Sequence, residues 1–503
     1  MVARIKTVAF LGVEATDVDI QVRISSGLPA FQIVGLADKA IAESRDRIRN
    51  AIESLGLAMP SSRITVNLSP ADLIKEGSHY DLPIALGVLV AMGIIPPEAT
   101  AELYAVGELN LDGRVASCYG VLVAAIYANA QKMHFLCPSE QGGEAAWAGE
   151  DLRLSPINHL KEAILLLKGE LTIKRPKAII AQTEEKFTDL ADIKGQETAK
   201  RALEVAAAGG LNMLMIGPAG SGKSMLASRL TGLLPPMLPQ EALETSMVHS
   251  LAGEGNRTGI LHTRPFREPH HSASIAALTG GGIRAKPGEI SLAHNGVLFL
   301  DELPEFQGRV LDSLRQPLET GKITVARANA HITWPACFQL IAAMNPCRCG
   351  ELNEPSKACS RAPKCALDYQ ARLSGPLLDR FDIIIQVPAV DASALLLPAP
   401  KEGTKEVKER VLAARRIQWK RYHQHGYFTN AKASVKNIEH DVLLRPNMAQ
   451  LLKDILSKQK LSARGFHRIL KTAQTIADLE ASSEISEHHL AEAVILRGGL
   501  IMG

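Results

Sequence analysis

The sequence has no apolar run long enough to cross a membrane. The best candidate, Leu82–Ile95, has Pro83 near its start and Pro96 after its end, and its length fits a buried helix. Near the N-terminus, Glu14 and Asp17 interrupt a short apolar run too early for a signal peptide. We therefore expect a cytoplasmic protein.

Charge of one sign and cysteine are also scarce. The net charge is only +3 over 503 residues, so a surface for a nucleic acid would have to be local. Cys118, Cys137 and Cys337 stand alone in apolar surroundings, as inert buried thiols usually do. The other four of the seven cysteines lie between positions 347 and 365, and in a cytosolic protein such a cluster favours a metal over disulfides.

The length is too great for one hydrophobic core, and the sequence pattern divides the chain into four parts. Residues 1–168 alternate between strand-like and helical periodicity and predict an α+β domain. Residues 169–188 have little periodicity and predict a linker. Apolar strands alternate with helices in residues 189–395, which is typical of a doubly wound α/β core, and residues 396–503 predict a helical domain.

The clearest chemical motif follows the strand-like run Leu211–Ile216 and opens a helix. It is a Gly-x-x-x-x-Gly-Lys-Ser loop made of Gly217, Pro218, Ala219, Gly220, Ser221, Gly222, Lys223 and Ser224. Its glycines let backbone N–H groups surround phosphates, while Lys223 can reach the β- and γ-phosphates and Ser224 can bind Mg²⁺. The flanking strand and helix argue against a chance match, so we predict an ATP site.

Two later strands also end in polar residues. The buried strand Val297–Leu300 ends at Asp301 and Glu302, which we predict to hold hydrated Mg²⁺ and to polarise the attacking water, respectively. The strand Leu340–Ala343 is followed by Asn345. An asparagine there is often a turn former, but its place after the acidic strand favours a sensor of the γ-phosphate.

Two arginines complete the set. Arg380, in the segment Leu377–Asp382, is the candidate arginine finger for the ATP of a neighbouring subunit; a local surface ion pair is the alternative. Arg464 is predicted to reach over the phosphates as a second sensor, with Arg468 as the fallback. This order of motifs resembles AAA+ ATPases over residues 189–503, and the resemblance implies a ring.

The stretch between Lys223 and Asp301 is long for one helix and two strands. Phe266–Ser272 and Gly280–Gly282 look like an insertion within a helix followed by a glycine-hinged loop, and Gly321–Ala330 predicts a hairpin. Both features resemble the helix-2-insert branch of AAA+ proteins, in which such loops point into the central pore.

Basic residues on these loops are candidate DNA contacts. They are Arg284 and Lys286 in the first loop and Arg327 and His331 on the hairpin. Contacts of this kind with phosphates are independent of sequence and sensitive to salt. Ordinary solvated loop charges are an equally weighted alternative.

Several longer segments resemble the ComM/YifB family of magnesium-chelatase-like proteins over nearly the whole chain. They are Phe266–Ser272, Ser291–Leu303, Ala343–Cys347 and Ser374–Arg380. The resemblance implies a hexameric, ATP-driven DNA helicase that promotes branch migration in homologous recombination during natural transformation. Its implied partners are single-stranded and branched DNA and recombination proteins. The alternative is a magnesium-chelatase-type ATPase that remodels a protein partner.

The N-terminal part resembles the Lon-protease-like domain, which has a ribosomal S5 domain 2-like fold, at Glu76–Pro83 and Gly107–Val115. We expect Leu103–Val115 to form a hairpin. Cleavage by a Lon-type protease needs a serine activated by a lysine. Ala116–Tyr127 contains no lysine, and Ser78 lies in a different setting from the nucleophile of that family, so we predict an inactive domain.

The cysteine cluster comprises Cys347, Cys349, Cys359 and Cys365. Four thiolates suit a closed structural Zn²⁺ site, although the spacing is not the common two-residue knuckle. An iron–sulfur cluster and free thiols are the alternatives.

A second basic stretch lies in the helical domain and contains Arg410, Arg415, Arg416, Trp419, Lys420, Arg421 and Tyr422. It can be a nucleic-acid surface or the solvated face of a helix, and the second interpretation is favoured.

Overall fold

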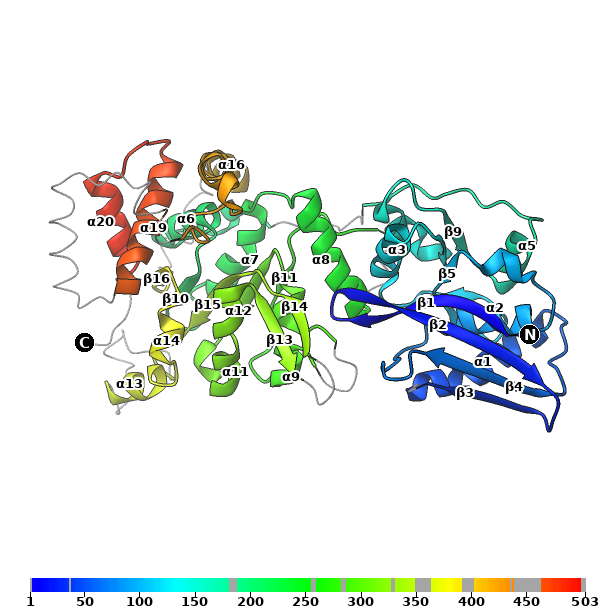
Figure 1. Ribbon diagram of the computed structural model, residues 1–503. Helices are drawn as coiled ribbons and strands as arrows, with labels where there is room; N and C mark the ends of the chain where they lie inside the picture. Colours follow the sequence, from blue (N-terminus) through cyan, green and yellow to red (C-terminus); the bar gives the residue numbers. More distant parts are fainter. Residues whose placement is uncertain are drawn as a thin grey trace.

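The computed structural model describes residues 2–35, 38–180, 188–254, 259–281, 286–326, 331–348, 363–390, 402–434, 437 and 463–498. The N-terminal part and the ATPase core each contain a sheet and lie side by side, with the C-terminal helices beyond the core (Figure 1). None of the helices in these ranges is long and apolar enough to cross a membrane.

The N-terminal sheet has seven strands in the order β3-β4-β2-β1-β5-β8-β9. Antiparallel pairs join β1 to β2 and β2 to β4, whereas the remaining neighbours are parallel. Its strands are β1 (Ala3–Leu11), β2 (Glu14–Ser25), β3 (Ala30–Val34), β4 (Arg63–Ser69), β5 (Leu103–Ala105), β8 (His134–Pro138) and β9 (Leu154–Ile157). The helices of this part include α1 (Lys39–Ser54), α2 (Asp81–Ala91), α3 (Val121–Ala130) and α5 (Leu160–Leu167).

Helix α2 is the centre of this part, as the apolar run in the sequence predicts. Its residues from Asp81 to Val90 are all buried. The buried Asp81 carboxylate accepts a bidentate pair of hydrogen bonds from Arg47, at 2.5 and 3.0 Å. Burial raises the pKa of Asp81, and the bonds from Arg47 and Ser44 oppose that rise. Because a buried charge is costly without a partner, this pair fixes how α1 packs on α2.

The hairpin expected at Leu103–Val115 needs a correction. Leu103–Ala105 forms β5 inside the main sheet, because all three of its residues are buried. The hairpin is shorter and pairs β6 (Glu108–Leu109) with β7 (Val115–Ala116).

The core sheet has five strands in the order β11-β12-β15-β10-β16, and all of its pairs are parallel. The strands are β11 (Phe266–Arg267), β12 (Val297–Leu300), β15 (Gln339–Met344), β10 (Met213–Ile216) and β16 (Ile383–Gln386). Every residue of β10, β12 and β15 is buried, as expected for parallel strands covered on both faces. Helices that pack around the sheet include α6 (Glu197–Gly209), α7 (Lys223–Leu233) and α8 (Pro239–Ala252). Parallel strands place all their carboxyl ends at one edge of the sheet, which is where the ATP motifs end up.

Two insertions leave the core on the side of β11 and β12. The first separates α9 (Ile275–Thr279) from α10 (Glu289–Leu292), and Gly281 pairs with Lys286 between them. The second is the hairpin of β13 (Lys322–Ala326) and β14 (His331–Pro335), which the sequence predicts. A side chain at Gly281 would lie 3.3 Å from Val325 Cγ1, so the two insertions touch.

The sequence pattern predicted that the motif Phe266–Ser272 is an insertion within a helix. In the structure the motif does not interrupt a helix. Its first two residues form the edge strand β11, because Phe266 pairs with Val297 and stacks on Phe299 at 6.0 Å. The helix is interrupted further along, between α9 and α10.

The described C-terminal residues form helices that pack on the core. They include α16 (Thr404–Tyr422), α19 (Ala463–Leu479) and α20 (Glu487–Ile495). Gln418 donates to the carbonyl of Ala208 at 3.1 Å, and Arg201 on α6 pairs with Glu492 on α20 at 2.8 Å. Apolar residues of the core and of these helices form one buried cluster, so the two parts share a hydrophobic core.

The N-terminal part meets the ATPase core at helix α8. The N–H of Gly120 donates to the carbonyl of Ser250 at 3.0 Å, and Ile180 pairs with Ile260. Leu122 of α3 packs with Met237 and other apolar residues of the core.

Candidate functional site

The glycine loop lies between β10 and α7, and its geometry needs glycine. Gly220 and Gly222 have φ values of +75° and +88°, which favour glycine. A Cβ at Gly217 would lie 2.1 Å from the carbonyl oxygen of Val387. The Lys223 ammonium donates to the carbonyls of Gly217 and Pro218 at 2.9 and 2.8 Å, which holds it at the loop. Burial lowers the pKa of Lys223, and the carboxylates of Asp301 and Glu302 oppose that change.

The structure brings the predicted ATP residues together at the carboxyl edge of the core sheet. Ser224 Oγ donates to Asp301 Oδ2 at 2.8 Å, which joins the loop to the end of β12. The Lys223 ammonium donates to Asn345 Oδ1 at 3.3 Å, which joins it to the end of β15. A hydroxyl and a carboxylate side by side are oxygen ligands of the kind that Mg²⁺ prefers. The glycine loop and this donor pair therefore fit a nucleotide with Mg²⁺.

Glu302 lies at the same edge and has a contact that the sequence did not predict. Its φ of +51° is rare for a residue with a side chain, and such strain gathers at functional sites. Glu302 Oε2 lies 3.3 Å from His271 Nδ1, and His271 in turn lies against His270, with ring centroids 4.1 Å apart. The signal in the sequence was that these histidines follow β11. Because β11 is parallel to β12, residues after both strands meet at one edge.

The candidate arginine finger lies at the opposite edge of the sheet. Arg380 is 6% exposed, and its guanidinium pairs with Glu319. The carbonyl of Arg380 accepts a 3.0 Å hydrogen bond from Asn212, just before β10 begins. Burial lowers the pKa of Arg380; Glu319 opposes the change, and the nearby Arg464 and Arg468 reinforce it.

Arg380 and Arg464 line one cleft of about 550 Å³ at this amino edge. The four residues of β10 separate that edge from the glycine loop, and parallel strands rise by about 3.3 Å per residue, so the separation is about 13 Å. Arg464, the predicted second sensor, therefore lies at the edge opposite the phosphate loop of its own chain. Arg468, the fallback, pairs with Asp382 in the same cleft.

The remaining predicted sites are described only in part. Lys286 donates to the carbonyl of Ala252 at 3.1 Å, and His331 begins β14. Arg284 and Arg327 lie outside the described residues, as do Cys349 and Cys359. Cys347 is buried after β15, and Cys365 lies on α13 (Lys364–Gln370).

The basic stretch on α16 is mostly structural. Arg410 pairs with Glu204 and Glu402, and Arg421 pairs with Asp478. The charged side chains of Arg416 and Lys420 are exposed.

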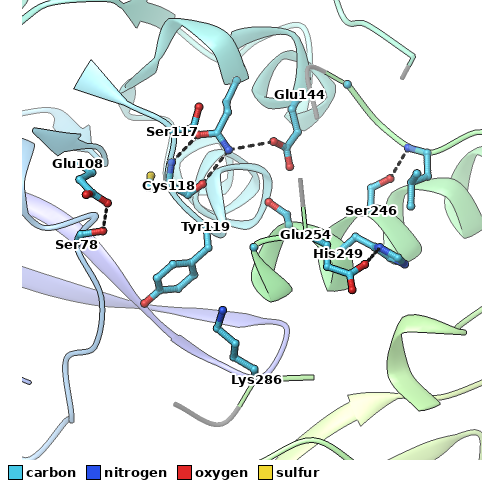
Figure 2. A pocket seen from close by; sticks show the side chains of 15 residues that line it. Ser78, Glu108, Ser117, Cys118, Tyr119, Glu144, Ser246, His249, Glu254 and Lys286 are labelled. Carbon is cyan, nitrogen blue, oxygen red and sulfur yellow. Dashed lines mark hydrogen bonds and ion pairs between the residues drawn. The ribbon is translucent and has the colours of Figure 1, made fainter. Parts of the chain in front are cut away.

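A polar cavity of about 220 Å³ lies where the N-terminal part meets the core (Figure 2). Ser78, Cys118 and Glu144 line it from one side, and His249 and Lys286 line it from the core. The Ser78 hydroxyl hydrogen-bonds to Glu108. Ser78 donates this hydrogen bond to the Glu108 carboxylate, which is the kind of contact expected of a serine with a structural role.

Comparisons with known proteins agree across the chain. Family profiles described as magnesium chelatase, subunit ChlI, as subunit ChlI of Mg-chelatase, and as the ChlI C-terminal part match residues 189–395, 20–141 and 401–497, respectively. The chain is 44% identical to competence protein ComM of Haemophilus influenzae over 97% of this chain and 95% of that protein. It is 43% identical to YifB of Escherichia coli, covering 98% and 96%. The magnesium-chelatase 38 kDa subunit of Rhodobacter capsulatus is 29% identical over 34% of this chain and 54% of that subunit.

The glycine loop and the acidic strand end can be tested directly. We expect Lys223→Ala and Glu302→Gln each to lower the rate of ATP hydrolysis by roughly a hundredfold or more, since each removes a group needed for charge stabilisation or water activation. The measurement is phosphate release, with circular dichroism to check folding. Glu305→Gln is the matched control, because it removes a neighbouring carboxylate that pairs with Arg372. Normal hydrolysis in Lys223→Ala would refute the site.

The contact with His271 restrains the rotation of the Glu302 side chain. We expect His271→Ala to raise the basal rate of ATP hydrolysis by about two- to fivefold, because a half-exposed pair contributes about 1 kcal/mol or less. His488→Ala is the control, since it removes a similar exposed contact, that of His488 with Glu480, and does not involve Glu302. Equal rates in both variants would show that the contact does not restrain Glu302.

Proposed function

Because the chain belongs to the ComM/YifB family of magnesium-chelatase-like AAA+ proteins, we propose that it is a ring-forming DNA helicase. In this proposal ATP hydrolysis drives branch migration during homologous recombination in natural transformation. Family membership implies an ATPase that uses Mg²⁺. The similarity to competence protein ComM of Haemophilus influenzae supports the link with transformation.

The chemistry of hydrolysis follows from the carboxyl edge of the sheet. Lys223 would bind the β- and γ-phosphates, and Ser224 and Asp301 would hold Mg²⁺, which neutralises developing charge on the phosphates. Glu302 would polarise the attacking water, and Asn345, bonded to Lys223, would orient it.

The proposal of a ring rests on one observation. Arg380 and Arg464 lie at the edge of the sheet opposite the glycine loop of their own chain. A separation of about 13 Å between the edges leaves Arg380 and Arg464 without access to the glycine loop of the same chain. A head-to-tail neighbour brings its carboxyl edge to this cleft, and repetition of that contact closes a ring. Arg380 and Arg464 then stabilise the phosphates of the adjacent subunit. A hexamer is the assembly that the family resemblance implies.

The DNA contacts are assigned to the two touching insertions. Lys286 lies in the first insertion and His331 in the hairpin β13–β14. Arg284 and Arg327, which lie outside the described residues, are the other two proposed contacts. In a ring, both insertions of each subunit would face the pore and bind phosphates without reading sequence. Recombination proteins that load the ring and a cytoplasmic location belong to the same proposal.

The alternative is a magnesium-chelatase-type ATPase that remodels a protein partner, which the similarity to the magnesium-chelatase 38 kDa subunit of Rhodobacter capsulatus favours. That relative covers about a third of this chain. The N-terminal part is assigned as a Lon-like domain without protease activity, kept for assembly or DNA binding.

The cysteine cluster completes the proposal as a structural Zn²⁺ site near Asn345. Cys347 is buried directly after β15, and Cys365 lies on α13. We assign Cys349 and Cys359 as the other two ligands, because four thiolates make a closed tetrahedral site.

The test of the function is stimulation by DNA. We expect single-stranded or branched DNA to raise the rate of ATP hydrolysis several-fold, and we expect branched DNA to be unwound only when ATP is hydrolysed. The assay measures phosphate release with and without DNA, and strand displacement from a labelled four-way junction. Glu302→Gln, which binds ATP without turnover, is the control. Absence of both effects would favour the protein-remodelling alternative.

Shared active sites can be tested by mixing variants. Lys223→Ala and Arg380→Ala should each be inactive alone, because one lacks the phosphate-binding lysine and the other the finger. Mixed rings contain some interfaces with both groups intact, so mixing should restore measurable hydrolysis. If mixing restores nothing while the mixed rings form normally, Arg380 does not act between subunits.

Zinc can be measured in the purified protein. We expect about one zinc per chain by atomic emission, and loss of that zinc in Cys347→Ala. Cys337→Ala is the matched control, since Cys337 lies outside the cluster. Substoichiometric zinc together with activity that resists chelators would contradict the assignment.

A further inference from the structure

A groove of about 280 Å³ lies between helix α16 and the amino edge of the core sheet. Trp419 and Arg415 line it from α16, Phe428 and Lys432 from the segment that follows, and Phe338 from the core. None of these residues belongs to the glycine loop or to the two insertions.

The groove exposes large aromatic side chains. Trp419 is 48% exposed and Phe428 is 41% exposed. Burial of such large apolar side chains lowers the free energy of the protein in water, so their exposure is unusual. The Trp419 indole lies nearly parallel to the His423 ring, with 4.5 Å between centroids and 12° between planes. His423 Nδ1 lies 3.0 Å from the carbonyl oxygen of Trp419, which fixes the stack. A rigid exposed ring offers a flat surface at little cost in side-chain entropy.

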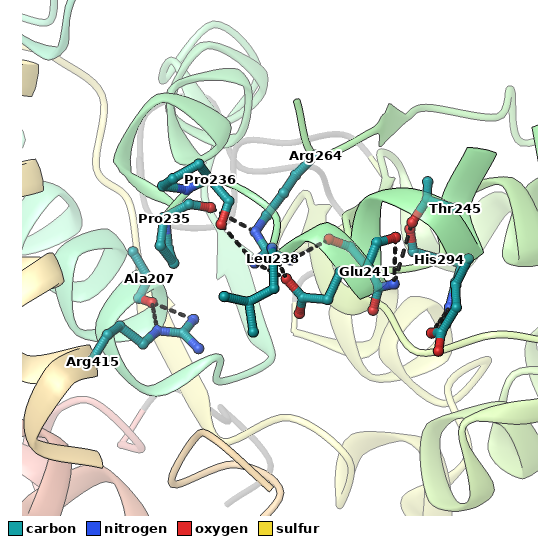
Figure 3. Close-up of polar contacts among 11 residues, drawn as sticks. Ala207, Pro235, Pro236, Leu238, Glu241, Thr245, Arg264, His294 and Arg415 are labelled. Carbon is teal, nitrogen blue, oxygen red and sulfur yellow. Dashed lines mark hydrogen bonds and ion pairs between the residues drawn. The ribbon is translucent and has the colours of Figure 1, made fainter. Parts of the chain in front are cut away.

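The groove also holds a cation without an acidic partner. Arg415 donates from Nε and Nη2 to the carbonyl of Ala207, at 3.1 and 2.7 Å, as Figure 3 shows. Within the part of the chain that the structure describes, no carboxylate bonds to Arg415. Burial lowers the pKa of Arg415 to about 9, and nearby Arg264 adds to this effect.

The neighbouring Arg264 provides the contrast. It pairs with Glu241 at 2.8 Å and donates to the carbonyls of Pro235 and Asn295 (Figure 3). Arg264 is therefore paired with a carboxylate, whereas Arg415 is bonded to a backbone carbonyl. Arg416 and Lys432 are exposed and add positive charge to the groove. A partly buried guanidinium that lacks a carboxylate is stabilised by an anion that enters the groove.

We propose that this groove binds single-stranded DNA, with a base stacked against Trp419 and Phe428 and a phosphate beside Arg415. Exposed aromatic faces combined with Arg and Lys are how proteins bind single strands without reading sequence. A duplex keeps its bases stacked inside and cannot offer them to such a groove. The inference rests on the proposed function and adds a second DNA site to it.

The position of the groove agrees with this role. Cys337 and Phe338, which form part of its wall, follow strand β14 of the hairpin almost directly. A Cβ at Gly321, before β13, would lie 2.5 Å from Cys337 Sγ, so the root of the hairpin borders the groove. The groove therefore adjoins the base of the hairpin to which the proposed function assigns DNA contacts.

The experiment compares full-length variants in binding to a fluorescent oligothymidine. We expect Trp419→Ala to weaken binding by about five- to a hundredfold, because stacking contributes about 1–3 kcal/mol per base. The double variant Arg416→Ala with Lys432→Ala should lower the slope of log affinity against log salt by about 1.4, at about 0.7 per phosphate contact. Binding of blunt duplex DNA should change little in either variant.

Lys405→Ala is the matched control, since it removes a charge from the same helix about 21 Å away at 1.5 Å per residue. Intrinsic fluorescence gives a second readout. Trp334 is buried and Trp147 donates to the carbonyl of Ile179, so quenching by the oligonucleotide should come from the exposed Trp419. Trp419→Phe should remove the quenching but keep most of the affinity.

The outcomes separate this inference from the proposed function. If DNA neither binds the wild type nor stimulates its hydrolysis, the helicase proposal fails and this site fails with it. If the wild type binds and is stimulated but Trp419→Ala binds equally well, only this inference is overturned. If Trp419→Ala instead changes the size of the assembly on gel filtration at unchanged affinity, the groove is a contact between subunits and the inference is overturned.

Discussion

The parallel direction of five buried strands is the constraint on which the rest of this structure depends. Parallel strands put every carboxyl end at one edge, so Lys223, Asp301 and Asn345, which are far apart in sequence, meet there. The same direction puts the residues that precede the strands at the other edge, where Arg380 and Arg464 line a cleft. The strands are about four residues or 13 Å long, and this length separates the residues at the carboxyl edge from the two arginines at the other edge.

That separation is the basis of the proposed assembly. If the glycine loop binds a nucleotide at one edge, the arginines at the other edge can act on it only in a neighbouring subunit. The insertions leave from the β11 and β12 side and touch each other at Gly281 and Val325. His271 joins this region to Glu302, since it follows β11 and precedes α9. A short stretch of chain therefore connects the first insertion to the residue that contacts Glu302.

Several elements followed from the residues alone because local chemistry determines them. The glycine loop needs φ values that only glycine adopts readily, and the run Val297–Leu300 is apolar enough to be a strand buried on both faces. Helix α2 was predicted because its buried residues Leu82–Val90 form an unbroken run without charged or polar side chains. The short hairpin β6–β7 was less well predicted. Leu103–Ala105 looks the same in sequence whether it pairs with the hairpin or joins the main sheet, and only burial on both faces decides between them.

The sequence by itself determined that the chain belongs with AAA+ proteins and that a Gly-x-x-x-x-Gly-Lys-Ser loop joins a strand to a helix, because these depend on residue types at fixed spacing. It could not determine on which side of the sheet a residue lies, since that depends on strand order and direction. Arg464 was predicted to reach over the phosphates as a second sensor, and only the tertiary structure shows that it shares a cleft with Arg380 at the other edge. Phe266 was predicted to begin an insertion within a helix, whereas pairing with Val297 makes it part of an edge strand. Neither the contact of His271 with Glu302 nor the aromatic groove at Trp419 could be predicted, because each joins segments that meet only after the core has folded.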